Sequence, residues 1–292
     1  MEKLIGRKGF GALCVIAAAV MWALEPIVAR YSYVNANFIQ TTTIRAIVTT
    51  VMAFVYIVST SGIESLKVKR SHLIKIAFIG IIGTTIADLL YFYSFNHIPV
   101  INAVLIGHMQ PIFIIILGLF IFSEEKHTGF DYIFIISMII ASLLITTKST
   151  ENLKSLKLGT YGDLLVLIST ILWALSGIIA KKYLSGLYTG ALVFYRFLTA
   201  SVILSIITSI YVGLAISNYY QIISGIIVFV GYMLYYEGLK RLKTAVTSSL
   251  ELTAPFFASL FGYAFFGETI TFLQGLGLGL IIIALVFFRH SE

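Results

Sequence analysis

Long apolar stretches separated by short polar connections run along almost the whole chain. A helix needs roughly 20 apolar residues to cross a hydrocarbon core of about 30 Å. Ten stretches of about that length cover approximately residues 9–31, 37–60, 72–95, 99–121, 128–147, 159–182, 188–211, 219–239, 244–265 and 269–288. Each is expected to be helical, because a lone helix satisfies its own backbone hydrogen bonds in lipid. The pattern predicts an all-α integral membrane protein with ten transmembrane helices.

The composition excludes the other large classes of protein. Of the 292 residues, 59 % are apolar and only 11 % are charged, whereas an ordinary globular domain carries roughly 25 % charged residues. So few charges could not cover a soluble surface, and the high apolar content is the opposite of a disordered chain. Cys14 is the only cysteine, so the chain cannot be held by internal disulfides. We therefore expect a multi-pass protein of the cell (plasma or inner) membrane.

The basic residues predict the orientation in the bilayer. With the N-terminus inside, fourteen lysines and arginines fall in the inner segments, residues 67–70 and 240–243 among them, and four fall in the outer segments. Cytoplasmic loops are enriched in these residues, so both termini are expected in the cytoplasm. The net charge of +7 is accounted for by these loops. No nucleic-acid motif occurs, and the expected surroundings are the lipid bilayer, with no nucleic acid.

The chain also contains an internal repeat. A shift of 151 residues superposes its only two tryptophans, Trp22 and Trp173, and also the two arginines deep inside apolar stretches, Arg45 and Arg196. A shift of 144 residues pairs further residues in the later helices: Tyr91 with Tyr235, Pro111 with Pro255, Gly118 with Gly262, Phe122 with Phe266 and Glu124 with Glu268. These coincidences predict two five-helix units, residues 1–148 and 158–292. An odd number of helices per unit makes the second unit inverted, as in alternating-access transporters.

These paired residues resemble the drug/metabolite transporter superfamily, EamA type. The similarity lies in Trp-Ala-Leu in the first helix of each half, an arginine in the second and a proline in the fourth. Its strongest stretch begins at Pro255 and continues through Phe266-Gly267-Glu268-Thr269 to Gln274-Gly275. The resemblance covers the whole chain. It implies ten helices, a central cavity between the halves, and export or uptake of small metabolites.

Ionisable side chains inside membrane helices are costly and usually either functional or paired. Six are predicted at depth: Glu25, Arg45, Asp88, His108, Arg196 and Glu251. The first four share a depth of roughly 9–14 Å from the outer edge, so we expect them to form a polar cluster that binds a proton or a cationic part of the cargo. The alternative for the acids is static pairing with the arginines. Arg45 and Arg196 either pair with an acid and with helix-end carbonyls, or contact an anionic group of the cargo. His108 is equally compatible with a helix–helix hydrogen bond.

Several uncharged residues are further candidates for the transport site. Trp22 and Trp173 lie mid-span, where they either face a cavity or pack between helices. Tyr91 shares a helix face with Asp88, Ser176 shares one with Trp173, and Tyr235 is the repeat partner of Tyr91. The prolines Pro26, Pro111 and Pro255 predict helix breaks, either lining the site or acting as simple kinks. The glycines Gly275, Gly277 and Gly279 predict close helix packing.

Motifs of enzymes and nucleotide-driven pumps do not occur. There is no HExxH, GxSxG, nucleotide-binding loop or Cys/His metal spacing, so we expect no metal, no cofactor and no catalysis. The favoured function is a secondary transporter, monomeric or homodimeric, that exports a small metabolite such as an amino acid or amine by alternating access, with protons as the candidate coupling ion. The alternatives are a membrane-embedded lipid-modifying enzyme or hydrolase that uses Glu25, Asp88 and His108, and a channel or sensor.

The predicted orientation can be tested by cysteine labelling in intact cells. A cysteine placed at Asn152 should react with a membrane-impermeant maleimide, because residues 150–157 are expected outside. A cysteine at Ser65, in the cytoplasmic connection, should remain unlabelled. Labelling at Ser65 but not at Asn152 would contradict both the orientation and the inverted repeat.

Overall fold

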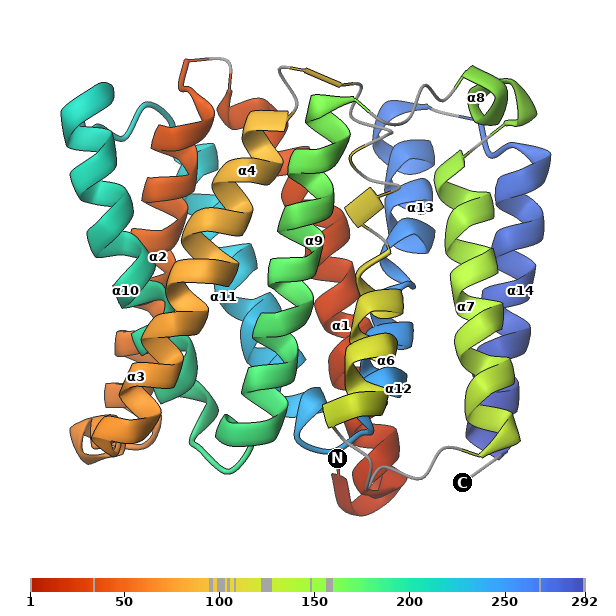
Figure 1. Cartoon of the computed structure of the whole chain (residues 1–292), viewed down its shortest axis with the longest axis horizontal. Coiled ribbons are helices and arrows are strands. Elements are labelled where there is room, and N and C mark those ends of the chain that lie inside the picture. Colours follow the sequence, from red (N-terminus) through yellow and green to blue (C-terminus); the bar gives the residue numbers. More distant parts are fainter. Residues whose placement is uncertain are drawn as a thin grey trace.

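The computed structural model of the chain is a bundle of helices that run roughly side by side (Figure 1). The structure describes residues 2–33, 35–94, 97–98, 103, 106–107, 109–121, 128–147, 149–155, 160–267 and 269–290. Within these ranges every regular element is a helix. The predicted all-helical membrane fold is confirmed.

The first half contributes four helices of full or nearly full span and part of a fifth. Its elements are α1 (Glu2–Ser32), α2 (Phe38–Thr60), the short η1 (Ile63–Leu66), the continuous segment α3 (Arg70–Ile79), η2 (Gly80–Ile86) and α4 (Ala87–Ser94), then α6 (Gln110–Ile121) and α7 (Gly129–Thr147). The short helix α8 (Thr150–Ser155) lies in the connection between the halves. The η2 segment is a π-helix, a wider winding that is frequent at functional sites.

The second half repeats this order. Its elements are α9 (Tyr161–Ile179) with η3 (Ala180–Leu184), α10 (Thr189–Tyr211), α11 (Tyr219–Leu239), α12 (Thr244–Glu251), α13 (Ala254–Phe266) and α14 (Phe272–His290). In the described part of the chain, six helical stretches are long and apolar enough to cross a membrane. Helices α7 and α14 each contain a shorter apolar stretch. The fourth helix of this half is divided into α12 and α13.

The two halves are inverted relative to each other. The N- and C-terminal ends lie at one face of the bundle, which we call the termini face, and α8 lies at the opposite face (Figure 1). From the termini face α1 rises, whereas its counterpart α9 starts at the opposite face and descends. This is the arrangement that an odd number of helices per half requires.

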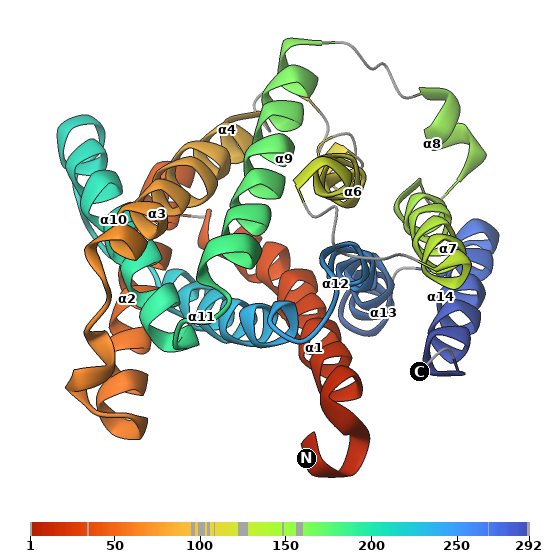
Figure 2. The same ribbon diagram turned by 60° about the horizontal axis from the view of Figure 1, so that its bottom comes forward.

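The halves are interleaved rather than packed as separate blocks. Helix α1 packs on α11 of the other half, and its counterpart α9 packs on α4, so these two contacts are equivalent under the repeat. The pairs α2–α10 and α7–α14 each join one helix to its own counterpart. Figure 2 shows α7 and α14 side by side at one edge of the bundle, away from α2 and α10. The centre is therefore enclosed by helices from both halves.

Two of the three predicted proline breaks coincide with helix ends. Pro111 and Pro255 are the second residues of α6 and α13, where a missing N–H costs no helical hydrogen bond. Residues 252 and 253 separate α13 from α12. By contrast, α1 remains helical across Pro26, so the break predicted there does not occur.

The glycines of α14 differ in their surroundings. A methyl group added to Gly277 would lie 2.6 Å from Ile145 Cγ1 and 2.8 Å from the carbonyl oxygen of Ala141, both in α7. A methyl group on Gly275 or Gly279 would meet no atom within 4 Å. The predicted close packing therefore holds for Gly277 and is wrong for the other two.

This difference provides a matched pair of variants. Gly277→Ala should separate α7 from α14 and lower stability by about 1–3 kcal/mol, as overpacking does, whereas Gly279→Ala should not lower it, because alanine favours the helix. Thermal unfolding in detergent would measure both. Equal loss of stability in the two variants would contradict the close α7–α14 contact.

Candidate functional site

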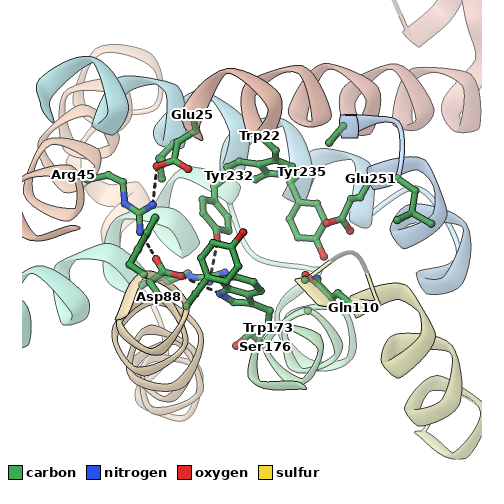
Figure 3. A pocket seen from close by; sticks show the side chains of 18 residues that line it. Trp22, Glu25, Arg45, Asp88, Gln110, Trp173, Ser176, Tyr232, Tyr235 and Glu251 are labelled. Atoms are coloured by element: carbon green, nitrogen blue, oxygen red, sulfur yellow. Dashed lines mark hydrogen bonds and ion pairs between the residues drawn. The ribbon is translucent and has the colours of Figure 1, made fainter. Parts of the chain in front are cut away.

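A cavity of about 250 Å³ lies at the centre of the bundle, between the two halves. Its lining includes ten of the eleven side chains that the sequence selects as binding or coupling candidates: Trp22, Glu25, Arg45, Asp88, Tyr91, Trp173, Ser176, Arg196, Tyr235 and Glu251. Figure 3 shows how the labelled members of this set converge from helices of both halves. The remaining candidate, His108, lies outside the described residues.

Arg45, on α2, forms ion pairs with two acids from neighbouring helices. Its Nη1 atom lies 3.0 Å from Glu25 Oε1 of α1, and its Nη2 atom bonds Asp88 Oδ2 of α4. The guanidinium also lies 5.2 Å from the centre of the Phe92 ring, and Glu25 Oε1 accepts a further hydrogen bond from Ser224 at 3.2 Å. One positive charge is shared by two carboxylates, so the trio carries a formal charge of −1 when all three are ionised.

Asp88 connects this ion-pair cluster to the second half of the chain. Its Oδ2 atom accepts from Arg45, and its Oδ1 atom accepts from the indole Nε1–H of Trp173 at 3.0 Å. The Trp173 ring also contacts Tyr91, with ring centres 5.0 Å apart. Both carboxylate oxygens of Asp88 are therefore engaged, one by each half.

Arg196 occupies the equivalent position to Arg45 but has different partners. Its Nε atom donates to Thr84 Oγ1 at 2.7 Å, and its Nη1 and Nη2 atoms donate to the hydroxyls of Tyr236 at 2.5 Å and Tyr232 at 3.1 Å. The guanidinium also lies 4.3 Å from the centre of the Tyr232 ring. Among the residues that the structure describes, no acid lies within ion-pair distance of Arg196, so the direct side-chain partners of this arginine are hydroxyl groups and not a carboxylate.

The repeat explains the difference between the two arginines. A shift of 151 residues places Ser176 where Glu25 stands, and a shift of 144 places Tyr232 where Asp88 stands. Hydroxyl groups thus replace the two carboxylates in the second half. Hydrogen bonds and ring faces stabilise a guanidinium, but they do not neutralise its charge.

Glu251 is the third acid at the cavity, and its situation differs from that of Glu25 and Asp88. It is the last residue of α12, at the break before α13. Its Oε1 atom is buried and has no hydrogen-bond partner within the described part of the chain. Figure 3 shows Glu251 beside Tyr235, with no interaction drawn to it.

Aromatic rings form much of the remaining wall. Trp22 of α1 meets Tyr232 of α11 edge to face, with ring centres 4.9 Å apart, and Trp173 of α9 lies against Tyr91 of α4. The helix pairs α1–α11 and α9–α4 are equivalent under the repeat, but the two tyrosines are not, because Tyr232 corresponds to Asp88 and Tyr91 to Tyr235. Each tryptophan contributes to the cavity from its own half and contacts a tyrosine of the other half. Within the described ranges, no group of three or more His, Cys, Asp or Glu side chains is placed to hold a metal ion.

Sequence reasoning missed eight residues of the lining: Phe92, Gly107, Gln110, Gly177, Val228, Tyr232, Leu252 and Ala254. Tyr232 is the most important of them because it contacts both Trp22 and Arg196. The shift of 144 residues that pairs Tyr91 with Tyr235 also pairs Asp88 with Tyr232, so the repeat contained the signal. The others are small, apolar or amide residues that carry no distinctive sequence pattern.

The ion pairs of Arg45 predict a specific pattern of rescue. Arg45→Gln leaves two buried carboxylates without a cation and should cost about 3–5 kcal/mol of stability. Adding Asp88→Asn should recover part of that loss, because it removes one of the uncompensated charges. The same Asp88→Asn change should not rescue Arg196→Gln, since Arg196 bonds hydroxyl groups rather than Asp88. Chemical unfolding in detergent would measure these variants, and equal rescue of both arginine variants would contradict the assignment.

Comparisons with known proteins agree with this architecture. The model of the EamA-like transporter family matches residues 9–147 and again residues 160–289. An uncharacterized transporter of Methanothermobacter thermautotrophicus is 22 % identical over 96 % of this chain and 82 % of its own length. The uncharacterized transporter YyaM of Bacillus subtilis is 23 % identical over 80 % of this chain and 78 % of its own.

Among the solved structures similar to this chain, a crystal structure shares the fold with a TM-score of 0.77 over 96 % of this chain and 97 % of that chain, at 12 % identity. The two family matches together span nearly the whole chain. The chain belongs to the EamA-like transporter family and is a membrane transporter.

Proposed function

We propose that this transporter exports a small metabolite that carries an amine group, and that the central cavity is its binding site. The observation that carries the proposal is the composition of the cavity wall. Three carboxylates and two arginines line it together with tryptophan and tyrosine rings. The formal balance is one negative charge when all five groups are ionised, and aromatic faces attract cations.

The size of the cavity supports a small cargo. Sites for drug-sized ligands commonly enclose about 300–1,000 Å³, and this cavity encloses about 250 Å³. A simple amine or an amino acid therefore suits the space better than a peptide or a large lipophilic compound. For an amino acid, the phenol-bonded guanidinium of Arg196 offers a positive group for the cargo carboxylate.

The repeat supports transport by alternating access. The contacts α1–α11 and α9–α4 are equivalent, so an exchange of their geometries converts a cavity open to one face into a cavity open to the other. We take residues 1–148 and 158–292 as the two repeating units, in keeping with the two separate family matches. We also assign the termini face to the cytoplasm, on the basis of its many basic residues.

The proposal can be tested with purified protein in liposomes. Amino acids, polyamines, nucleobases and organic cations are first screened for thermal stabilisation of the protein in detergent, since a ligand that binds only the folded state raises its stability. The stabilising compounds are then tested for counterflow, in which unlabelled internal compound drives uptake of the labelled compound. Amines or amino acids should give saturable counterflow in wild-type liposomes.

Two controls give the result its meaning. Protein-free liposomes should show no counterflow, and Gly279→Ala, which changes no contact near the cavity, should behave as wild type. Non-saturable flux without counterflow would indicate a channel. Chemical conversion of the compound would indicate an enzyme, and either result would refute the proposed function.

A further inference from the structure

The three carboxylates at the cavity are not equally available to a ligand. Glu25 and Asp88 share the guanidinium of Arg45, and the second oxygen of Asp88 accepts from Trp173. Any proton or cation that binds these two acids must compete with an arginine already in place. Glu251 is the third carboxylate of the lining, and its buried Oε1 atom has no partner among the described residues.

We infer that Glu251 is the group at which one proton and the cationic part of the cargo exclude each other, so that transport exchanges one for the other. This inference rests on the proposed function, and it names the coupling residue and the coupling ion for that site. The sequence already made Glu251 a binding or coupling candidate, but the proton or cation site predicted from it was the cluster of Glu25, Asp88 and His108 with Arg45 beside them.

Among the residues that the structure describes, none around Glu251 is a compensating cation. Helix α12 packs on α1, α6, α7 and α11. Facing the cavity, α1 contributes Trp22 and Glu25, α6 contributes the neutral Gln110, and α11 contributes Tyr232 and Tyr235. Helix α7 meets α12 through the apolar cluster that contains Met138, Val246 and Leu250.

The other charged and titratable groups of the cavity lie on helices α2, α4 and α10. Arg45 is held by Glu25 and Asp88, and Arg196 by two phenols and Thr84. Tyr91 of α4 completes the titratable set of the described lining. An ionised Glu251 is therefore buried without an ion-pair partner among the described residues, which costs free energy that a proton or a bound cation removes.

The position of Glu251 at a helix break adds to this effect. As the last residue of α12, it lies at the negative end of the helix dipole, which further disfavours a carboxylate. The connection to α13 is only residues 252 and 253. A change in the angle between α12 and α13 would move Glu251 relative to the cavity. The position of its carboxyl group can therefore depend on the face of the bundle to which the cavity is open.

The repeat predicts the stoichiometry of the exchange. A shift of 144 residues pairs Glu251 with Gly107, which also lines the cavity but has no side chain to titrate. Among the described residues of this repeat pair, only Glu251 therefore carries a titratable group. Arrival of a monovalent ammonium group releases the proton of Glu251 to the open side, and a proton later displaces the ammonium on the other side. One positive charge moves in each direction, and an inward proton gradient drives export.

The test uses the amine with the strongest counterflow, in liposomes that contain wild-type or variant protein. A pH gradient of one unit should drive about tenfold accumulation of a monovalent amine at one-for-one exchange. Glu251→Gln should abolish this accumulation, whereas Glu251→Asp, which keeps a titratable group, should retain it. Glu64→Gln, at an exposed acid on η1 that pairs with Lys67, is the matched control and should accumulate the amine as wild type does.

A second measurement, chemical modification of the wild-type protein, requires no variant and no transport assay. Dicyclohexylcarbodiimide adds to protonated carboxyl groups in apolar surroundings, and peptide mass spectrometry locates the adduct. Glu251 of the wild-type protein should be modified, less so at high pH, and the amine should protect it.

The outcomes separate this inference from the function on which it rests. Absence of counterflow in wild type refutes the proposed function. Normal counterflow with full pH-driven accumulation in Glu251→Gln overturns the role of Glu251 alone. Loss of coupling in Asp88→Asn but not in Glu251→Gln, or carbodiimide modification of Glu25 or Asp88 in place of Glu251, moves the exchange to the Arg45 cluster and also overturns it.

Discussion

The ion pair between Arg45 and Asp88 is the interaction on which the centre of this protein depends. It joins α2 to α4 in a region where an unpaired charge is costly, and the second oxygen of Asp88 extends the connection to Trp173 of the other half. Because both halves are fixed to the same carboxylate, they meet around the central cavity. Any large rearrangement of the halves has to preserve this contact or replace it with another.

The two halves of the site have diverged chemically while keeping the same geometry. Arg45 and Arg196 are equivalent, yet the first is neutralised by carboxylates and the second is held by Tyr232 and Tyr236. One end of the cavity is thus an ion-pair cluster in which two carboxylates share one arginine, and Glu251, an acid without an ion pair among the described residues, lies on α12. The two ends of the cavity therefore differ in charge although the surrounding fold is a repeat. A cargo with one charged group can bind in one preferred orientation.

Rare residues made much of the architecture predictable from the sequence. The two tryptophans and the two arginines inside apolar stretches are few enough that their coincidence under one shift reveals the duplication, and the length of each apolar stretch determines the helices. Which side chains contact one another was harder to predict, because these contacts depend on side-chain geometry between helices. With 17 tyrosines in the chain, Tyr232 did not stand out. The different environments of Gly277 and Gly279 likewise depend on which face of α14 meets α7.

The central claim is that the cavity binds a cation in exchange for a proton at a single carboxylate. The most direct measurement is proton release on binding: the purified wild-type protein is titrated with a monovalent amine in weakly buffered detergent solution while the pH is recorded. Linkage requires that a ligand which excludes a proton releases it. The account predicts that release rises to about one proton per bound amine as the starting pH is lowered. Binding without proton release at any pH would contradict it.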